Sequence, residues 1–172
     1  MDSLFHVGGK PFFSIGGQLN NSTSSDPALT EKAFKTCVGL GLNTVAAPVH
    51  WELFEKEEGA YDFAQIDMLM ELARRSGLRL VVLWFGTWKN GNSHYVPEWV
   101  KLQKERFLWA KANDGAEIRA LSPTCEETKK ADMRAFCELC GHIARNNADG
   151  CVIGIQIENE PGLILSLIHI SE

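Results

Sequence analysis

Long apolar runs are absent from this sequence of 172 residues. No stretch approaches the roughly 18 apolar residues of a membrane-spanning helix, so we expect no membrane partner. An excess of positive charge is also absent, because the formal net charge is -5, and this disfavours a nucleic-acid partner. Residues 1–10 lack the basic start and the apolar segment of a signal peptide, which predicts a cytoplasmic protein.

Cysteine pairs and metal-binding patterns are also scarce. The five cysteines form an odd set, which fits reduced thiols. Cys137 and Cys140 form a C-x-x-C, but no second pair follows, and we predict that they pack on a helical stripe with Met133, Phe136 and Ile143. No His, Cys and Asp set has metal-ligand spacing, and no phosphate-binding glycine motif precedes a helix. We therefore expect neither a metal nor a cofactor.

The chain does contain alternating strand and helix patterns. Apolar runs at 11–17, 42–49, 78–85 and 152–160 predict four strands, with helices between them over about 26–40, 62–77 and 124–145. Residues 86–123 form a long irregular segment with one short helix near 97–104, and long loops of this kind are usually functional. Alternation of this type predicts an α/β fold with a parallel sheet and right-handed crossovers.

The expected fold is a truncated (β/α)8 TIM barrel. A complete barrel needs about 250 residues, and this chain ends just after the fourth predicted strand. We therefore expect residues 1–164 to be the amino-terminal half of the barrel, strands 1 to 4.

The last eight residues, 165–172, read as a non-native tail. They match in every position the translation of an adapter used in transposon-based preparation of DNA libraries. A genuine amphipathic segment is the alternative.

The end of the fourth predicted strand carries the chemistry. The apolar run 151–155 is followed by Gln156, Glu158, Asn159 and Glu160. Polar groups at the exit of a buried parallel strand lie at the active-site face of a β/α barrel. A carboxyl group beside an amide suits glycoside hydrolysis, in which an acid protonates the leaving oxygen and hydrogen bonds form to the sugar 2-OH. A capped strand with solvated acids is the alternative.

Several segments, in order, resemble glycoside hydrolase family thirty-five, the β-galactosidase family of clan A. They are Gly16-Gly17, Asn43-Thr44-Val45, Trp51 followed by Glu55, Glu58-Gly59-Ala60-Tyr61-Asp62-Phe63, the Gly77-Leu78 strand start and the stretch from Gln156 to Gly162. Family forty-two β-galactosidases share much of the second of these segments. The Q-I-E-N-E-x-G ending is more similar to family thirty-five.

The resemblance assigns roles to the strand-four residues. Glu160 corresponds to the general acid/base, and Asn159 to the amide that contacts the sugar 2-OH. Glu158 is the first acid of the E-N-E, for which the resemblance implies positioning and charge balance beside the site. The nucleophile lies on strand seven in this clan, so this chain does not contain it.

The resemblance weakens at the strand-two and strand-three exits. Pro48 stands where the family has a sugar-contacting tyrosine, although Trp51 and His50 are candidates for substrate contact. Where many members have C-A-E, this chain has a segment in which Trp88 could stack on a sugar and Lys89 and Asn90 could bind hydroxyls. For His50, a structural role at the strand end is the alternative.

The resemblance implies a retaining exo-β-galactosidase that cleaves terminal β-galactosyl residues of oligo- or polysaccharides, with two carboxyl groups about 5 to 5.5 Å apart. Alternatives are another clan A enzyme, such as a family forty-two β-galactosidase or a glucan or mannan hydrolase, and a non-catalytic sugar-binding or inert truncated product. The expected ligand is a β-galactoside or a related oligosaccharide, and the oligomeric state is left open. The isolated chain is expected to be inactive.

Overall fold

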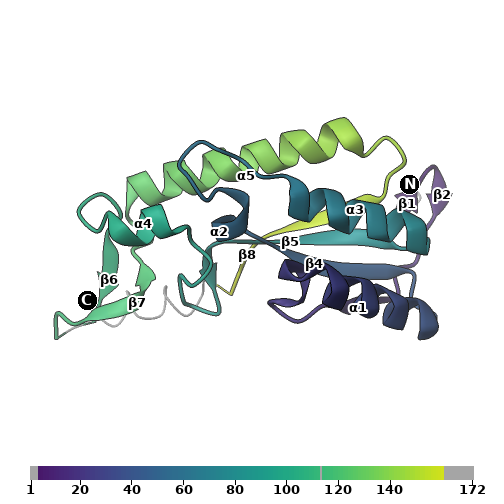
Figure 1. Ribbon diagram of the computed structural model, residues 1–172, viewed down its shortest axis with the longest axis horizontal. Coiled ribbons are helices and arrows are strands. Elements are labelled where there is room, and N and C mark those ends of the chain that lie inside the picture. The colour runs from purple at the N-terminus through teal and green to yellow at the C-terminus, as the bar shows by residue number, and fades with distance from the viewer. Residues whose placement is uncertain (1–3, 113, 161–172) are drawn as a thin grey trace. The chain divides into compact units, whose positions relative to one another are not determined.

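The polypeptide alternates between strands and helices over the residues that the computed structural model describes, 4–112 and 114–160. Strands β3 (Gly16–Gln18), β4 (Thr44–His50), β5 (Arg79–Lys89) and β8 (Val152–Asn159) form one sheet in the order β3-β4-β5-β8. The sheet is parallel, and helices occupy the connections between its strands (Figure 1). The predicted α/β fold is therefore confirmed. The predicted tail at 165–172 lies outside the described residues.

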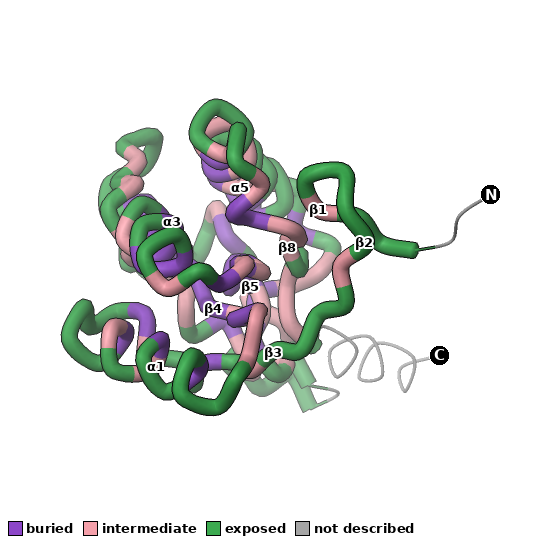
Figure 2. The backbone as a smooth tube through the Cα atoms, turned by 90° about the vertical axis from the view of Figure 1, so that its right-hand side faces the viewer, coloured by how far each residue is buried: buried purple, intermediate pink, exposed green. Residues whose placement is uncertain are grey.

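The described residues divide into two units, and the first contains 4–48, 63–83 and 141–155. Its helices are α1 (Pro27–Gly39) and α3 (Ala64–Ser76), which lie on one side of its strands with buried residues between them (Figure 2). Asp26 caps α1 by accepting a hydrogen bond from the Leu29 amide at 2.9 Å. Gly77 ends α3 with a φ of 66°, a left-handed conformation that glycine adopts without strain.

Two elements near the amino terminus differ from the sequence expectation. A hairpin of β1 (His6–Val7) and β2 (Lys10–Pro11) precedes β3. Its turn is Gly8-Gly9, and both glycines have a positive φ, 58° and 74°, as a tight hairpin turn requires. The strand predicted over 11–17 therefore pairs in the main sheet only from Gly16 onward.

The second unit contains residues 49–62, 84–140 and 156–160. Its elements are α2 (Trp51–Phe54), α4 (Glu98–Leu102), β6 (Trp109–Lys111), β7 (Glu117–Leu121) and most of α5 (Glu126–Asn146). The carboxyl-terminal ends of β4, β5 and β8 also belong to it. The segment predicted to be irregular thus holds the expected short helix and, in addition, the antiparallel hairpin β6-β7.

Helix α5 buries a different stripe from the predicted one. Its most buried apolar side chains are Ala131, Ala135, Leu139 and Ile143. Met133 and Cys137 are exposed, so the packing predicted for them is wrong. The reason is that the buried positions recur every four residues from Ala131, which turns Met133 and Cys137 to the opposite side.

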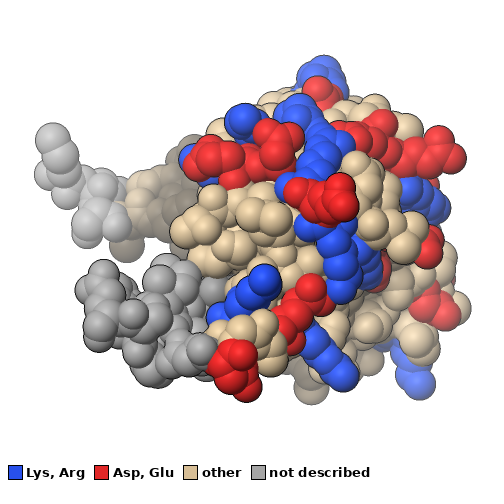
Figure 3. Space-filling model, turned by 90° about the vertical axis from the view of Figure 1, so that its left-hand side faces the viewer, with Lys and Arg blue, Asp and Glu red and all other residues tan. Residues whose placement is uncertain are grey.

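The molecular surface mixes both signs of charge. In Figure 3, Lys and Arg side chains lie beside Asp and Glu side chains. Within the described part of the chain, no helix combines the length and the apolar composition needed to cross a bilayer.

Candidate active site

The carboxyl-terminal ends of β5 and β8 are joined through one acidic side chain. The backbone amides of Thr87 and Trp88 donate hydrogen bonds to Glu158, at 2.9 Å and 2.7 Å. Asn90 adds a third link, because its amide donates to the Asn159 carbonyl at 3.0 Å. These bonds hold the segment that carries the predicted acid/base against the end of the neighbouring strand.

Asp132 of α5 lies beneath the same junction. It is buried, and it accepts hydrogen bonds from the Trp84 indole at 2.7 Å and from the amide and hydroxyl of Thr87. The pKa of Glu158 is raised well above its usual range, first because burial penalises the charged carboxylate and second because Asp132 is bonded to it and adds negative charge. The raised pKa favours the protonated form of Glu158.

Lys89 and Asn90 lie beside Asn159. The Lys89 ammonium donates to the Asn159 side-chain oxygen at 2.7 Å and to the Asn90 side-chain oxygen, and it is largely buried. Asn90 and Gly91 have φ values of 51° and 69°, and the Lys89 and Asn92 backbones exchange hydrogen bonds across them. An Asn-Gly pair in such a tight turn is a common hairpin connection. The turn places Lys89 and Asn90 at the end of β8, and their contact with sugar hydroxyls stays a prediction.

Glu160 follows Asn159 directly, and its side chain is exposed. Glu158 and Glu160 both have left-handed backbones, with φ of 59° and 54°. Residues other than glycine rarely adopt this conformation, and such positions concentrate at functional sites. The acid/base role of Glu160 stays a prediction.

Two candidates at the exit of β4 are buried. His50 has 1% of its surface exposed and stacks on Tyr95, with ring centroids 4.7 Å apart. Trp51 is fully buried, and its indole donates to the Glu55 carboxylate at 2.6 Å. Their roles in substrate contact stay predictions, and for His50 the burial favours the structural alternative.

The remaining tryptophans divide between the core and the loops. Trp84 is fully buried and belongs to the core. Trp88 is half-buried, and its indole donates to the Leu121 carbonyl of β7 at 3.1 Å. Trp99 donates to the Glu55 carbonyl at 2.9 Å, so it anchors the long segment. Stacking of Trp88 on a sugar stays a prediction.

Sequence reasoning missed Asp132, although a signal was present. The residue occupies a buried position beside Ala131 on an otherwise apolar helix stripe. An acid at such a position must find donors inside the fold.

Among the described residues, no group of three or more His, Cys, Asp or Glu side chains has the arrangement of a metal site.

Comparison with known proteins places the chain in context. The family model of glycosyl hydrolases family 35 matches residues 4–169. A β-galactosidase of Xanthomonas manihotis is 24% identical over 157 residues, which cover 90% of this chain and 24% of that protein. An exo-β-D-glucosaminidase of Pyrococcus horikoshii is 28% identical over 140 residues, which cover 70% of this chain and 17% of that protein. The chain thus spans about a quarter or less of these curated relatives.

Solved structures support the fold. The exo-β-1,4-mannosidase Op5Man5 from Opitutaceae bacterium strain TAV5 superposes with a TM-score of 0.66 at 19% identity, covering 92% of this chain and 27% of that one. The catalytic domain of a β-amylase from Paenibacillus polymyxa gives 0.60 at 21% identity, covering 81% and 35%. The described strands and helices are therefore part of a TIM barrel. With its match over most of its length, the chain belongs to glycosyl hydrolases family 35.

Proposed function

We propose that this chain is the amino-terminal part of a retaining exo-β-galactosidase, in which Glu160 is the general acid/base. The observation that carries the proposal is the exit of β8, where an exposed Glu160 follows an Asn159 that is held by Lys89. Family membership and the β-galactosidase relative support it. Residues 1–164 would supply strands 1 to 4 of the barrel, and the nucleophile would come from strand seven.

Asn159 is oriented for a sugar hydroxyl. Because an ammonium group can only donate, the Asn159 oxygen must face Lys89. The NH₂ group of Asn159 then points away from Lys89 and can donate to the 2-OH of a bound sugar. In the first step, Glu160 gives its proton to the leaving oxygen while the nucleophile forms the glycosyl-enzyme. In the second step, Glu160 takes a proton from the attacking water.

A β-glucosaminide is the second candidate substrate, since one relative is an exo-β-D-glucosaminidase. Its sugar has an amino group at the 2 position, which is protonated near neutral pH. Lys89 is positive and bonds directly to the residue that would contact this position. Like charges at close range repel in a partly dehydrated site, so Lys89 favours a neutral 2-hydroxyl.

The acid/base role is tested by Glu160→Gln in the complete enzyme. Activity should fall most on substrates with poor leaving groups and least on activated aryl β-galactosides, whose phenolate needs little protonation. Azide should partly restore turnover of the activated substrate, because the glycosyl-enzyme still forms. Asn159→Ala should lower kcat/KM similarly for all leaving groups.

Glu105→Gln is the matched control, since Glu105 is exposed and lies on the loop after α4. An equal loss for Glu160→Gln on both substrate types, without azide rescue, would exclude Glu160 and make Glu158 the candidate. Turnover of aryl β-glucosaminides above that of β-galactosides would replace the proposed substrate.

A further inference from the structure

Two carboxyl groups share a single hydrogen-bond donor at the junction of β5, β8 and α5. One oxygen of Asp132 and one oxygen of Glu158 each lie 2.9 Å from the Thr87 amide nitrogen. Oxygens that converge on one N–H are close to each other. If both groups were ionised, two negative charges would adjoin in a largely dehydrated place, which is unfavourable.

Among the described residues, no Lys or Arg forms an ion pair with Asp132 or Glu158. The charged groups on the surrounding elements have other partners or are exposed. Lys89 of β5 bonds to Asn159 and Asn90, and Glu160, which follows β8, is exposed. On α5, Lys129 pairs with Glu126, Lys130 with Glu127 and Arg134 with Glu58. A proton held between the two carboxyl groups would relieve this repulsion.

The contact of Asp132 with Thr87 and Glu158 requires a glycine at position 86 of β5. A Cβ atom added to Gly86 would lie 2.7 Å from both carboxylate oxygens of Asp132. Real Cβ atoms do not come so close, so any side chain here would push Asp132 away from Thr87 and Glu158. Gly86 therefore permits Asp132 to reach the end of β8 from α5.

We propose that Asp132 and Glu158 hold one proton between them, and that Asp132 is through this bond a positioning residue for Asn159 and Glu160. The assignment of Asn159 and Glu160 as substrate-facing rests on the proposed function, whereas the shared proton does not. Burial and the nearby Asp132 raise the pKa of Glu158, in agreement with the geometry. In alkaline solution the proton leaves, the two carboxylates repel, and the end of β8 separates from the Thr87 and Trp88 amides.

The shared proton is tested first by infrared spectroscopy of the 172-residue chain. This measurement can be made even if the chain associates. A protonated carboxyl group absorbs at a different infrared frequency from an ionised one. Labelling with ¹³C-glutamate shifts the frequency of the glutamate bands only. At pH 7 we expect a labelled protonated band that Glu158→Gln removes and that Glu105→Gln leaves in place. In Asp132→Asn, the band should vanish at a lower pH than in the wild type.

The positioning role is tested by amide hydrogen exchange of residues 85–89 across pH, expressed as protection relative to the unfolded chain. Wild-type protection should fall about tenfold or more at the pH where the infrared band is lost. Glu158→Gln can donate permanently to Asp132, but its single oxygen accepts from only one of the Thr87 and Trp88 amides. It should therefore keep part of this protection, without the alkaline fall. Glu158→Ala should lack the protection of the Trp88 amide, which donates to Glu158, at every pH.

The proposal is overturned if the wild type shows no glutamate carboxyl band at pH 7, or if Glu158→Gln is as unprotected as Glu158→Ala. Neither measurement uses catalysis. A failed acid/base test of Glu160 would therefore leave this result unaffected, and the reverse also holds.

Discussion

The Trp51 and Glu58-Gly59 segments meet at one buried carboxyl group. Glu55 accepts hydrogen bonds from the Trp51 indole at 2.6 Å and from the Gly59 amide at 2.7 Å. Gly59 has a φ of 80°, which a residue with a side chain rarely adopts. The segments that carry the family resemblance on this side thus build a support for the β4 exit. The two segments could be recognised in the sequence. That both donate to Glu55 depends on how the chain folds.

Glu55 should make stability depend on pH. Burial raises the pKa of Glu55 above the usual value of a glutamate, in spite of its two hydrogen-bond donors. A group with a raised pKa stabilises the fold fully below its unfolded pKa, and this contribution is lost as the pH rises through the folded pKa. In Glu55→Gln, one donor faces an NH₂ group, which costs about 1–2 kcal/mol. We expect the difference in melting temperature between wild type and variant to shrink from pH 4 to pH 8.

Glu105→Gln serves again as the control, and its difference from the wild type should be small throughout. A difference for Glu55→Gln that grows with pH would show that Glu55 is stabilised as a carboxylate. Melts are compared at one protein concentration, because association changes the melting temperature.

Helices and strands were predictable where local patterns determine them. The cap at Asp26, the glycine end of α3 and the apolar run of β8 all lie where the sequence placed them. The hairpin β6-β7 was missed because distant contacts hold it, such as the Ser93 amide donating to the Arg119 carbonyl at 2.9 Å. For the same reason Glu158 could be placed at the site from its motif, whereas Asp132 reaches it only through the packing of α5.

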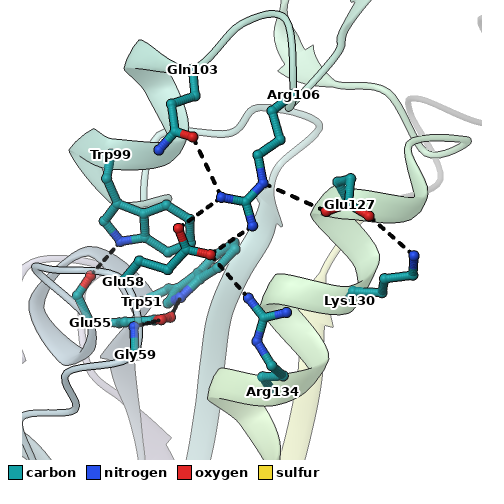
Figure 4. A network of polar contacts seen from close by, with 10 residues as sticks. All are labelled: Trp51, Glu55, Glu58, Gly59, Trp99, Gln103, Arg106, Glu127, Lys130 and Arg134. Carbon is teal, nitrogen blue, oxygen red and sulfur yellow. Dashed lines mark hydrogen bonds and ion pairs between the residues drawn. The ribbon is translucent and has the colours of Figure 1, made fainter.

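An ion-pair network connects the segment after α2, the segment after α4 and helix α5 (Figure 4). Arg106 binds Glu58 with two bonds of 2.7 Å, and Arg134 approaches the same carboxylate at 3.3 Å. Arg106 also lies 3.6 Å from Glu127. A two-bond contact holds its geometry better than a single exposed pair does.

Removal of Glu58 should therefore destabilise the chain by about 1 kcal/mol at low salt, near the upper end for surface pairs. The cost of Glu58→Gln should decrease at high salt, because screening weakens these partly exposed charges. Glu31→Gln is the matched control, since Glu31 pairs with Lys35 one helical turn away at 2.9 Å and lies only at 4.0 Å from Arg75, and the Glu31–Lys35 pair is more exposed than the Arg106–Glu58 pair. It should cost no more than about 0.5 kcal/mol. Equal costs for both variants would show that the network adds nothing beyond single pairs.

Over the described residues, the four-stranded sheet has two edge strands, β3 and β8, in the strand order β3-β4-β5-β8. In a closed barrel each edge would pair with a further strand. Ile157, near the end of β8, is 65% exposed, and Phe13, shortly before β3, is 81% exposed. Unpaired backbone groups beside exposed apolar side chains favour association with other chains.

We therefore expect the 172-residue chain to associate at micromolar concentration, as measured by light scattering after size-exclusion chromatography. Ile157→Lys places a charge on the β8 edge and should reduce association. Leu102→Lys is the matched control, because Leu102 is 75% exposed on α4 and is not part of a sheet edge, so it should have less effect. Deletion of residues 165–172 tests the predicted tail: association should persist through the edges, and solubility should stay equal or improve. A monodisperse monomer with a cooperative melt would contradict edge association, and solubility that falls on deletion would show that the tail belongs to the fold.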